Sequence, residues 1–372
     1  MSSNEKNIPK RRFKEFLEGE AWEERKLGDV VDVFSGRDYK HLSEGSIPVY
    51  GTGGYMLSVN EALSYDKDAI GIGRKGTIDK PYVLKAPFWT VDTLFYAIPK
   101  EQYNLDFVFN IFQLINWKGK DESTGVPSLS KTAINDVDIF IPKSLEQEKI
   151  GAHFHKIDNL ITLHQRKLDK LKVLKKAYLA QMFPSVGKSK PRLRFSGFND
   201  DWEQRKLCEI ADRFDNLRVP VAADLRKEGL TPYYGANGIQ DYVEGFTHDG
   251  EFILVAEDGA NDLKNYPVNY VNGRIWVNNH AHVLQGKDKI TDTRFLGYSI
   301  NRANIASLLV GGGRAKLNSD IMMNIQLQLP SVEEQKLISE YFSSIDNLIT
   351  LHQRKLEKLQ NIKKAYLNEM FV

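Results

Sequence analysis

The sequence predicts an α+β protein made of two copies of one unit, in pseudo-twofold repeat. Each copy is an α/β domain followed by a long helix, and the two helices are expected to form an antiparallel coiled coil. Two observations carry this prediction. The segment IDNLITLHQRKL occurs at residues 157–168 and again at 345–356. The motif Trp-Glu-x-Arg-Lys-Leu also occurs twice, from Trp22 and from Trp202. An identical match of this length indicates a duplication, which dictates the architecture.

Composition limits the class of protein. The 372 residues are 41% hydrophobic, which is enough for two domains of ordinary size. The chain contains no run of about 18 apolar residues and no secretory signal at its N-terminus. The single cysteine, Cys208, excludes a disulfide framework and a thiolate zinc site, so a cytoplasmic protein is expected. A net charge of +2 means that any contact with DNA must rest on local patches or on partner subunits.

The repeat pattern also sets the expected boundaries. These are an N-terminal linker segment (1–20), a first domain (21–143), a central helix (144–184), a linker (185–201), a second domain (202–331) and a C-terminal helix (332–372). The sequence PKRRF at 9–13 resembles PRLRF at 191–195, so a similar linker precedes both domains. We therefore expect the N-terminal segment to pack near the end of the C-terminal helix.

The two helices are expected at about residues 146–183 and 334–371, because Pro is absent from the first stretch and Gly151 is its only glycine. Apolar residues alternate with the 4-3 spacing of a coiled-coil seam. The predicted interface is Phe154, Ile157, Ile161, His164, Leu168, Leu171, Phe342, Ile345, Ile349, His352, Leu356 and Leu359. Seam residues that keep their type in both copies indicate that the helices pack on each other. Antiparallel packing is favoured, because parallel packing would crowd both domains at one end.

Two features of these helices have alternative interpretations. His164 and His352 could bind a metal as a pair, but a polar seam residue that fixes register is the preferred interpretation. The basic stretch from Arg166 to Lys176 is either a solvated face or a contact for DNA phosphate.

The regions that precede the helices share only a skeleton. We expect buried strands at 68–73 and 251–256, further strands at 88–91 and 275–278, and a helix at 105–117. Matching loops at 125–130 and 313–318 lead into a last strand that ends at Pro142 or Pro330. Elsewhere the copies diverge. A common skeleton with divergent surfaces is typical of two recognition modules for two different ligands.

The sequence contains no pattern that predicts catalysis. Gly71 to Gly76 matches G-x-G-x-x-G, but Pro81 forbids the helix that a dinucleotide site requires, so a β-turn is expected. Neither a phosphate-binding P-loop nor the Asn/Asp-Pro-Pro-Tyr/Phe tetrapeptide of amino-methyltransferases is present. His280 and His282 are expected on one strand face without a clear acidic partner, which favours partly buried histidines over zinc. We therefore predict a non-catalytic protein without a metal site.

The order of these motifs resembles the specificity subunit of type I restriction-modification enzymes. The resemblance rests on Trp-Glu-x-Arg-Lys-Leu before each divergent region, and on Pro, Glu-Gln and the repeated helix segment after it, and covers the chain from Pro9 to Phe371. It implies that the two domains are target recognition domains, each reading half of a bipartite DNA site. The helices would set the spacing and dock two modification subunits that methylate adenine. S-adenosylmethionine, ATP and Mg²⁺ would bind to those subunits and to motor-nuclease restriction subunits, and this chain would bind no cofactor.

Base readout in the major groove favours Arg or Lys on guanine and Asn or Gln on adenine. The candidates, taken from turns outside the shared skeleton, are Arg37, Lys40, Arg74, Lys75, Arg218, Asn261, Lys264, Arg274 and Arg314. Two other classes stay open: a stand-alone bipartite DNA-binding regulator, and a scaffold that uses the coiled coil as a spacer.

Overall fold

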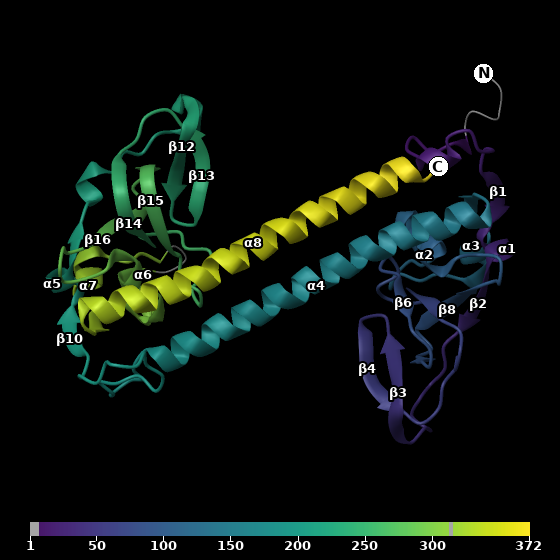
Figure 1. Ribbon diagram of the computed structural model, residues 1–372, viewed down its shortest axis with the longest axis horizontal. Helices are drawn as coiled ribbons and strands as arrows, with labels where there is room; N and C mark the ends of the chain where they lie inside the picture. The colour runs from purple at the N-terminus through teal and green to yellow at the C-terminus, as the bar shows by residue number, and fades with distance from the viewer. Residues whose placement is uncertain (1–6, 312–314) are drawn as a thin grey trace. The chain divides into compact units, whose positions relative to one another are not determined.

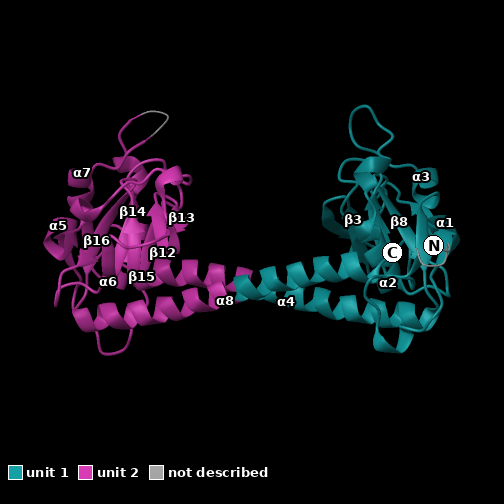
Figure 2. Cartoon of the chain, turned by 90° about the horizontal axis from the view of Figure 1, so that it is seen from above, with its two compact units in different colours: residues 1–167, 352–372 teal, residues 168–351 magenta. Residues whose placement is uncertain are grey.

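The computed structural model describes residues 7–311 and 315–372 (Figure 1). The chain divides into two compact units, residues 1–167 with 352–372, and residues 168–351 (Figure 2). We call them unit 1 and unit 2. Each unit contains one α/β domain and one half of each long helix, so the division passes through both helices.

In unit 1, β1 (Glu23–Lys26) pairs antiparallel with β9 (Asp138–Ile141). A four-stranded sheet has the order β2 (Val31–Ser35), β8 (Leu94–Pro99), β5 (Ala69–Gly73) and β6 (Tyr82–Leu84). A three-stranded sheet has the order β4 (Gly54–Val59), β3 (Glu44–Gly51) and β7 (Trp89–Thr90). The short helices are η2 (Lys14–Phe16), α1 (Leu27–Val30), α2 (Leu105–Leu114), η3 (Trp117–Lys120) and α3 (Lys131–Asn135).

Unit 2 has the same order of elements in a different sheet arrangement. Strand β10 (Glu203–Lys206) pairs with β17 (Gln326–Leu329). A single six-stranded sheet has the order β11 (Ala211–Arg213), β16 (Ala281–Gly286), β14 (His248–Ala256), β15 (Val268–Val277), β12 (Glu228–Gly235) and β13 (Gly238–Val243). The helices are α5 (Leu207–Ile210), η4 (Asp215–Leu217), η5 (Ala223–Leu225), α6 (Thr293–Arg302), η6 (Ile305–Leu308) and α7 (Ser319–Met323).

The strands and helices that the repeat predicts are present in both units. The buried strands expected at 68–73 and 251–256 correspond to β5 and β14, and the helix expected from Leu105 corresponds to α2. The G-x-G-x-x-G segment forms the end of β5 and a turn. A Cβ on Gly73 would lie 2.0 Å from the Thr77 carbonyl oxygen, so this turn requires glycine.

One helix in each domain is fixed to a long helix by the same contacts. The side chains of Asn104 and Asp292 cap α2 and α6. The backbone N–H of Asn104 donates to Gln147 of α4, and that of Asp292 donates to Gln335 of α8. Because Gln147 and Gln335 are equivalent residues of the repeat, each domain is attached to its long helix in the same way.

The long helices are α4 (Ser144–Met182) and α8 (Val332–Met370). Within each unit, half of α4 lies beside half of α8 (Figure 2), and the colour gradients of the two helices run in opposite directions (Figure 1). Lys363 and Asp158 form an ion pair of 2.6 Å in unit 1. Their repeat equivalents, Lys175 and Asp346, form one of 2.5 Å in unit 2. The helices therefore form an antiparallel coiled coil in which the two copies exchange the same contacts.

The twelve predicted interface residues are all buried or half-buried. Phe154 packs into the unit 1 core with Met370 and Phe371, and Phe342 packs into the unit 2 core with Met182 and Phe183. His164 Nδ1 lies 2.8 Å from His352 Nδ1, so one imidazole donates to the other. This contact joins a residue to its own repeat equivalent, as expected for a polar pair that fixes register.

The linker before each domain is held by a buried ion pair. The Arg12 guanidinium donates two hydrogen bonds to Glu146 in unit 1, and Arg194 does the same to Glu334 in unit 2. The backbone N–H of Arg11 donates to the carbonyl of Glu369, 2.8 Å away. The N-terminal segment thus lies beside the end of α8, within unit 1.

Candidate nucleic-acid interface

Among the candidate DNA-reading residues of unit 1, the structure brings Arg74 and Lys75 together. Both are exposed and line a hollow of about 420 Å³ with Phe95, Glu122 and residues 128–131. The Arg74 guanidinium lies 5.7 Å from the centre of the Phe95 ring. We call this cavity the unit 1 hollow. Arg37 and Lys40 are also exposed but do not line it.

Backbone contacts build the unit 1 hollow from two distant segments. The N–H of Leu129 donates to the carbonyl of Arg74, and the N–H of Gly76 donates to that of Pro127. The Asp121 carboxylate accepts hydrogen bonds from Ser128 and Ser123. These bonds lower the pKa of Asp121. The loop after Asp121 is therefore fastened to the end of β5, which holds Lys131 near Arg74 and Lys75.

A hollow of about 550 Å³ occurs at the equivalent place in unit 2. The N–H of Leu317 donates to the carbonyl of Glu257, as that of Leu129 does to Arg74. Asp258 and Lys316 form the same isolated β-bridge as Lys75 and Ser128. The two units thus form a hollow from the same elements. We call this one the unit 2 hollow.

The chemistry of the two hollows differs. Arg74, Lys75 and Lys131 face a single acid, Glu122, in unit 1. In unit 2, Arg213, Arg218 and Lys316 are accompanied by Asp215, Glu257 and Asp320. The first hollow therefore carries an excess of positive charge, which suits a phosphate or the acceptor edge of guanine, whereas the formal charges of these residues in the second cancel.

A network of charges fills the base of the unit 2 hollow. Arg218 Nη1 donates to Glu257, 2.6 Å away, and Lys316 Nζ lies 2.7 Å from the other oxygen of Glu257. Burial acts to raise the pKa values of Asp215 and Glu257, but their cationic and hydrogen-bonding partners outweigh it. A hydrogen bond and the charge of His282 are the main causes that lower the pKa of Asp215. Hydrogen bonds from Lys316 and Arg218 are the main causes that lower the pKa of Glu257.

The expectation for His280 and His282 was wrong in two respects. Only His282 lies on strand β16, because His280 precedes it. Both have acidic partners: His280 Nδ1 lies 2.5 Å from Asp258, and His282 Nδ1 lies 2.7 Å from Asp215. The sequence could not show this, because Asp215 lies far from His282 along the chain and is brought close by the pairing of β11 with β16.

Asp215, Glu257 and His282 are close enough to offer ligand atoms to one cation. However, Arg218 and Lys316 already bind the carboxylates. The other ring nitrogen of His282 bonds the carbonyl of Leu317. A metal would have to displace these partners, so the described contacts favour a structural ion network.

The other candidates of unit 2 lie in different surroundings. Arg218 is half-buried, and its guanidinium is occupied by Glu257 and by the carbonyl of Ala281, which argues against base readout. Asn261 and Lys264 are exposed in the loop after β14. Arg274, also exposed, pairs with Asp249 and lies over the Phe246 ring. Arg314 lies outside the described residues.

Apart from Arg74, Lys75 and Arg218, sequence reasoning missed the residues that line the hollows, among them Glu122, Lys131, Lys316 and Asn318. The matching loops at 125–130 and 313–318 were the available signal, because each precedes the equivalent last strand of its copy, β9 or β17. Sequence alone did not show that Leu129 and Leu317 bond back to the residues that follow β5 and β14.

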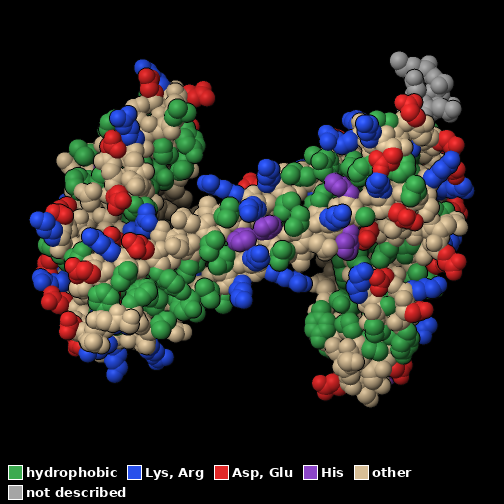
Figure 3. All heavy atoms as spheres, viewed as in Figure 1, with side chains coloured by type: hydrophobic (Ala, Val, Ile, Leu, Met, Phe, Trp, Pro, Cys, Tyr) green, Lys and Arg blue, Asp and Glu red, His purple; other side chains and the backbone are tan. Residues whose placement is uncertain are grey.

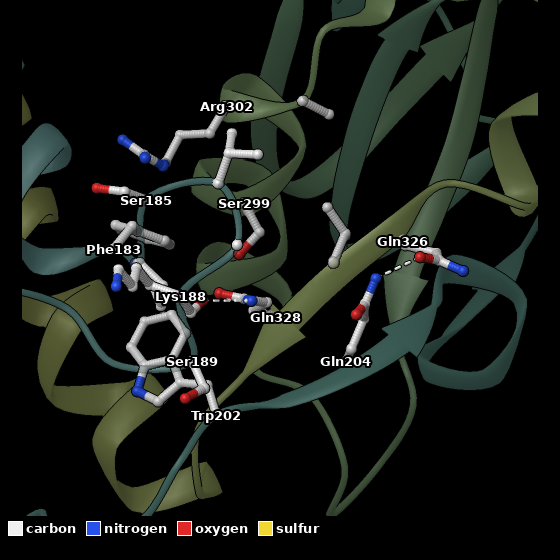
Figure 4. A pocket seen from close by; sticks show the side chains of 15 residues that line it. Phe183, Ser185, Lys188, Ser189, Trp202, Gln204, Ser299, Arg302, Gln326 and Gln328 are labelled. Atoms are coloured by element: carbon white, nitrogen blue, oxygen red, sulfur yellow. Dashed lines mark hydrogen bonds between the residues drawn. The ribbon is translucent and has the colours of Figure 1, made fainter.

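A further cavity, of about 590 Å³, lies in unit 2 between the linker after α4 and strands β10 and β17. Figure 4 shows Gln328 bonded to Lys188 of that linker, and Gln204 bonded to Gln326 across the strands. None of the candidate DNA residues lines it. The polar contacts drawn there fix the linker and join β10 to β17.

The long helices also carry exposed leucines. Leu160 and Leu163 of α4 are 44% and 46% exposed, and their equivalents in α8, Leu348 and Leu351, are each 44% exposed. Figure 3 shows hydrophobic side chains gathered over the N-terminal part of α8. The four exposed leucines lie in the identical repeat segment, but none of them is a residue of the coiled-coil seam.

No helix among the described residues is long and apolar enough to cross a membrane. A comparison with curated proteins finds a putative type I restriction enzyme specificity subunit of Haemophilus influenzae that is 42% identical over 146 residues. This match covers 39% of the chain and 38% of that relative. The MjaVIII specificity subunit of Methanocaldococcus jannaschii is 22% identical over 68% of the chain and 65% of its own length. The chain therefore spans less than two thirds of the length of either relative.

The crystal structure of a type I restriction-modification S subunit from M. genitalium has the same fold. The TM-score is 0.80 at 13% identity, and the match covers 98% of this chain and 99% of that one. The sequence model of the type I restriction modification DNA specificity domain matches residues 19–173 and 199–361. These two segments make up most of the sequence and correspond to the two copies of the repeat, so the chain belongs to the family of type I restriction-modification DNA specificity proteins.

Proposed function

We propose that the chain is the non-catalytic DNA-recognition subunit of a type I restriction-modification complex in the cytoplasm. Each domain reads one half of a bipartite double-stranded DNA site, and the helices set the spacing between the halves. Two modification subunits bound to the chain methylate adenine with S-adenosylmethionine. Restriction subunits that use ATP and Mg²⁺ join through the complex.

The observation that carries this proposal is the pair of equivalent hollows. The same elements build both, yet one has an excess of cations and the other a balanced ion network. A single ligand with two identical ends would not require this difference. Two different DNA half-sites would, because each base pair presents its own pattern of donors and acceptors in the major groove.

The exposed leucines of α4 and α8 are the proposed docking points for the modification subunits. A surface that is repeated without change fits two copies of the same partner. Leu160 and Leu163 supply it on one helix, and Leu348 and Leu351 supply it on the other. Since these side chains are not needed in the seam, their identity in both copies is consistent with a shared partner.

The proposal is tested by reconstitution. The purified chain alone should show no methyltransferase, ATPase or nuclease activity and should bind DNA weakly. Addition of modification subunits should give sequence-specific binding and adenine methylation, which sequencing of the methylated DNA would read directly. Tight, specific DNA binding by the chain alone would instead support a stand-alone regulator. Stable assembly without any methylation would contradict the proposal.

The candidate base-reading residues belong to the same proposal. In unit 1, Arg74 and Lys75 have the strongest structural support, because they are exposed side by side in a basic hollow. Lys131 joins them from the start of α3. We propose Arg37, Lys40, Asn261, Lys264, Arg274 and Arg314 as further contacts, either to bases or to phosphates.

A further inference from the structure

Unit 1 has a second cavity, of about 320 Å³, where α2 and β6 face the long helices. Its walls include Val83 and Phe109 of the domain, and Ile161 of α4. Polar groups line the rest, among them Asp106, Asn110, His155, Asp158 and Lys363. None of these residues belongs to the proposed DNA surface.

Asn110, which lines this cavity, has a buried acceptor without a donor. Asn110 is 1% exposed. Its amide nitrogen donates to the carbonyl of Asp106, 2.7 Å away. Because a carbonyl can only accept, the amide orientation is fixed and the side-chain oxygen is left without a partner. A buried polar atom in this state costs free energy unless a ligand or water satisfies it.

The equivalent region of unit 2 is filled by longer side chains. Tyr298 stands at the position of Asn110 and donates its hydroxyl to Asp346, 2.8 Å away. Arg294 stands at the position of Asp106, lies 4.2 Å from the centre of the Tyr270 ring and donates to Ser343. Val83 replaces Tyr270 in unit 1, as the pairing of β5 with β6 and of β14 with β15 shows. Unit 1 therefore lacks the guanidinium, the phenol and the aromatic platform that unit 2 supplies itself.

The lysines near this cavity are paired with carboxylates other than Asp106. Lys363 pairs with Asp158, and Lys85 pairs with Asp68. Among the described residues, the one ion pair that Asp106 forms is with His155, at 3.3 Å. A carboxylate thus stands where unit 2 has a guanidinium, next to an unsatisfied amide oxygen and the ring of Phe109.

We propose that the unit 1 cavity binds a guanidinium group, which replaces the one that Arg294 provides in unit 2. A planar guanidinium can donate to both Asp106 and the Asn110 oxygen, because its donors form a fixed fork. The Phe109 ring, which already has Lys363 Nζ 5.9 Å from its centre, lines the same cavity and offers a further cation–π contact. The group belongs either to a small guanidine compound or to an arginine side chain of a partner protein, since both have the same recognition chemistry.

The test titrates methylguanidinium into the full chain and follows binding by calorimetry and by the side-chain amide NMR signals of ¹⁵N-labelled asparagine. Saturable binding in the millimolar range is expected, with a shift of the Asn110 signal. Asp106→Asn should weaken binding by roughly tenfold or more, because one charge-assisted hydrogen bond is lost. Asn110→Tyr, which copies unit 2, should abolish it. Asp32→Asn, another acid of unit 1 with an exposed side chain, should leave binding unchanged, and methylurea, the neutral analogue, should not bind.

Assembly of the Asn110→Tyr variant with the modification subunits distinguishes the two sources of the guanidinium. If Asn110→Tyr also weakens assembly with modification subunits, the group is an arginine of that partner. If assembly is unchanged, the ligand is a small compound. Asp106→Asn retains the size of the side chain and gives the answer if Asn110→Tyr does not fold. Absence of saturable methylguanidinium binding, or equal binding to wild type and Asp106→Asn, would overturn the proposal, whatever the outcome of the DNA experiments.

Discussion

Unit 1 and unit 2 share most of their elements in the same order but differ in their sheets and in the chemistry of their hollows. In unit 2 one strand, β15, joins two parts of the sheet, and its equivalent in unit 1 is divided into β6 and β7, giving two sheets. Pro87 lies in the dividing segment and has no N–H to donate to a neighbouring strand. The helix caps and the linker ion pairs attach each domain to the long helices in the same way in both units. Under the proposed function, the shared helices and attachments serve assembly, and the differing sheets and hollows serve the two DNA half-sites.

The largest expected effect comes from breaking what the units share. Leu168 and Leu356 are equivalent seam residues, 3% and 8% exposed. The double substitution Leu168→Asp with Leu356→Asp buries two unpaired charges, each costing several kcal/mol. Thermal unfolding should show a large loss of stability. The matched control, Leu163→Asp, lies on the same helix at an exposed position and should change the melting temperature little. If the double variant melts like the wild type, these residues do not form the seam.

A second shared feature is the buried ion pair of each linker. Glu146 and Glu334 have side chains that are only 2% and 1% exposed. Arg12→Met and Arg194→Met should each cost about 3–5 kcal/mol, because each leaves a buried carboxylate without its partner. Arg194→Met with Glu334→Gln should recover part of the loss. Denaturant unfolding of the three variants measures this. A clearly different cost in the two units would show that the attachments are not equivalent.

The third prediction sharpens the difference between the hollows. Arg74→Ala should weaken specific DNA binding by about 1–3 kcal/mol and relax one position of one half-site, if Arg74 reads a base. If Arg74 contacts phosphate, all sequences should weaken alike. Arg218→Ala should instead reduce stability, because Glu257 loses a buried partner, and should leave the half-site unchanged. Methylation profiles and melting temperatures of both variants provide the check. An Arg218→Ala variant of normal stability with relaxed specificity would reverse the assignment.

The smallest effect is a pH dependence at the seam. Burial, and then the charges of His352, Lys355 and Lys167, lower the pKa of His164. The unfolded chain therefore binds this proton at a higher pH than the folded chain, and stability falls as the pH drops below about 6.5. The loss of melting temperature between neutral and mildly acidic pH should be smaller in His164→Asn with His352→Asn. His41→Asn, a histidine outside the helices, should keep the wild-type pH profile. An unchanged profile in the double variant would exclude the seam pair as its source.

Much of the fold could be predicted because duplication exposes it. The seam residues recur with constant spacing, and β5 has its equivalent in β14, so each copy supports the other. Helix α2 was predicted from the apolar spacing of the first copy alone. The sheet order could not be predicted. The second copy has one continuous strand, β15, where the first has β6 and β7, so the repeat gave no sign of the division. Of the candidate site, Arg74 and Lys75 were predicted and lie together. Lys131, at the start of α3, and Lys316 were missed, because they reach the hollows only through tertiary contacts.

The contrast between constant helices and variable domains is tested most directly by domain exchange. Residues 21–143 are replaced by the first domain of another family member, and the chimera is reconstituted with the modification subunits. Sequencing of the methylated DNA then gives both half-sites and the gap between them. The proposed function predicts that one half-site changes while the other half-site and the gap stay the same. A chimera that changes both half-sites, or only the gap, would contradict it.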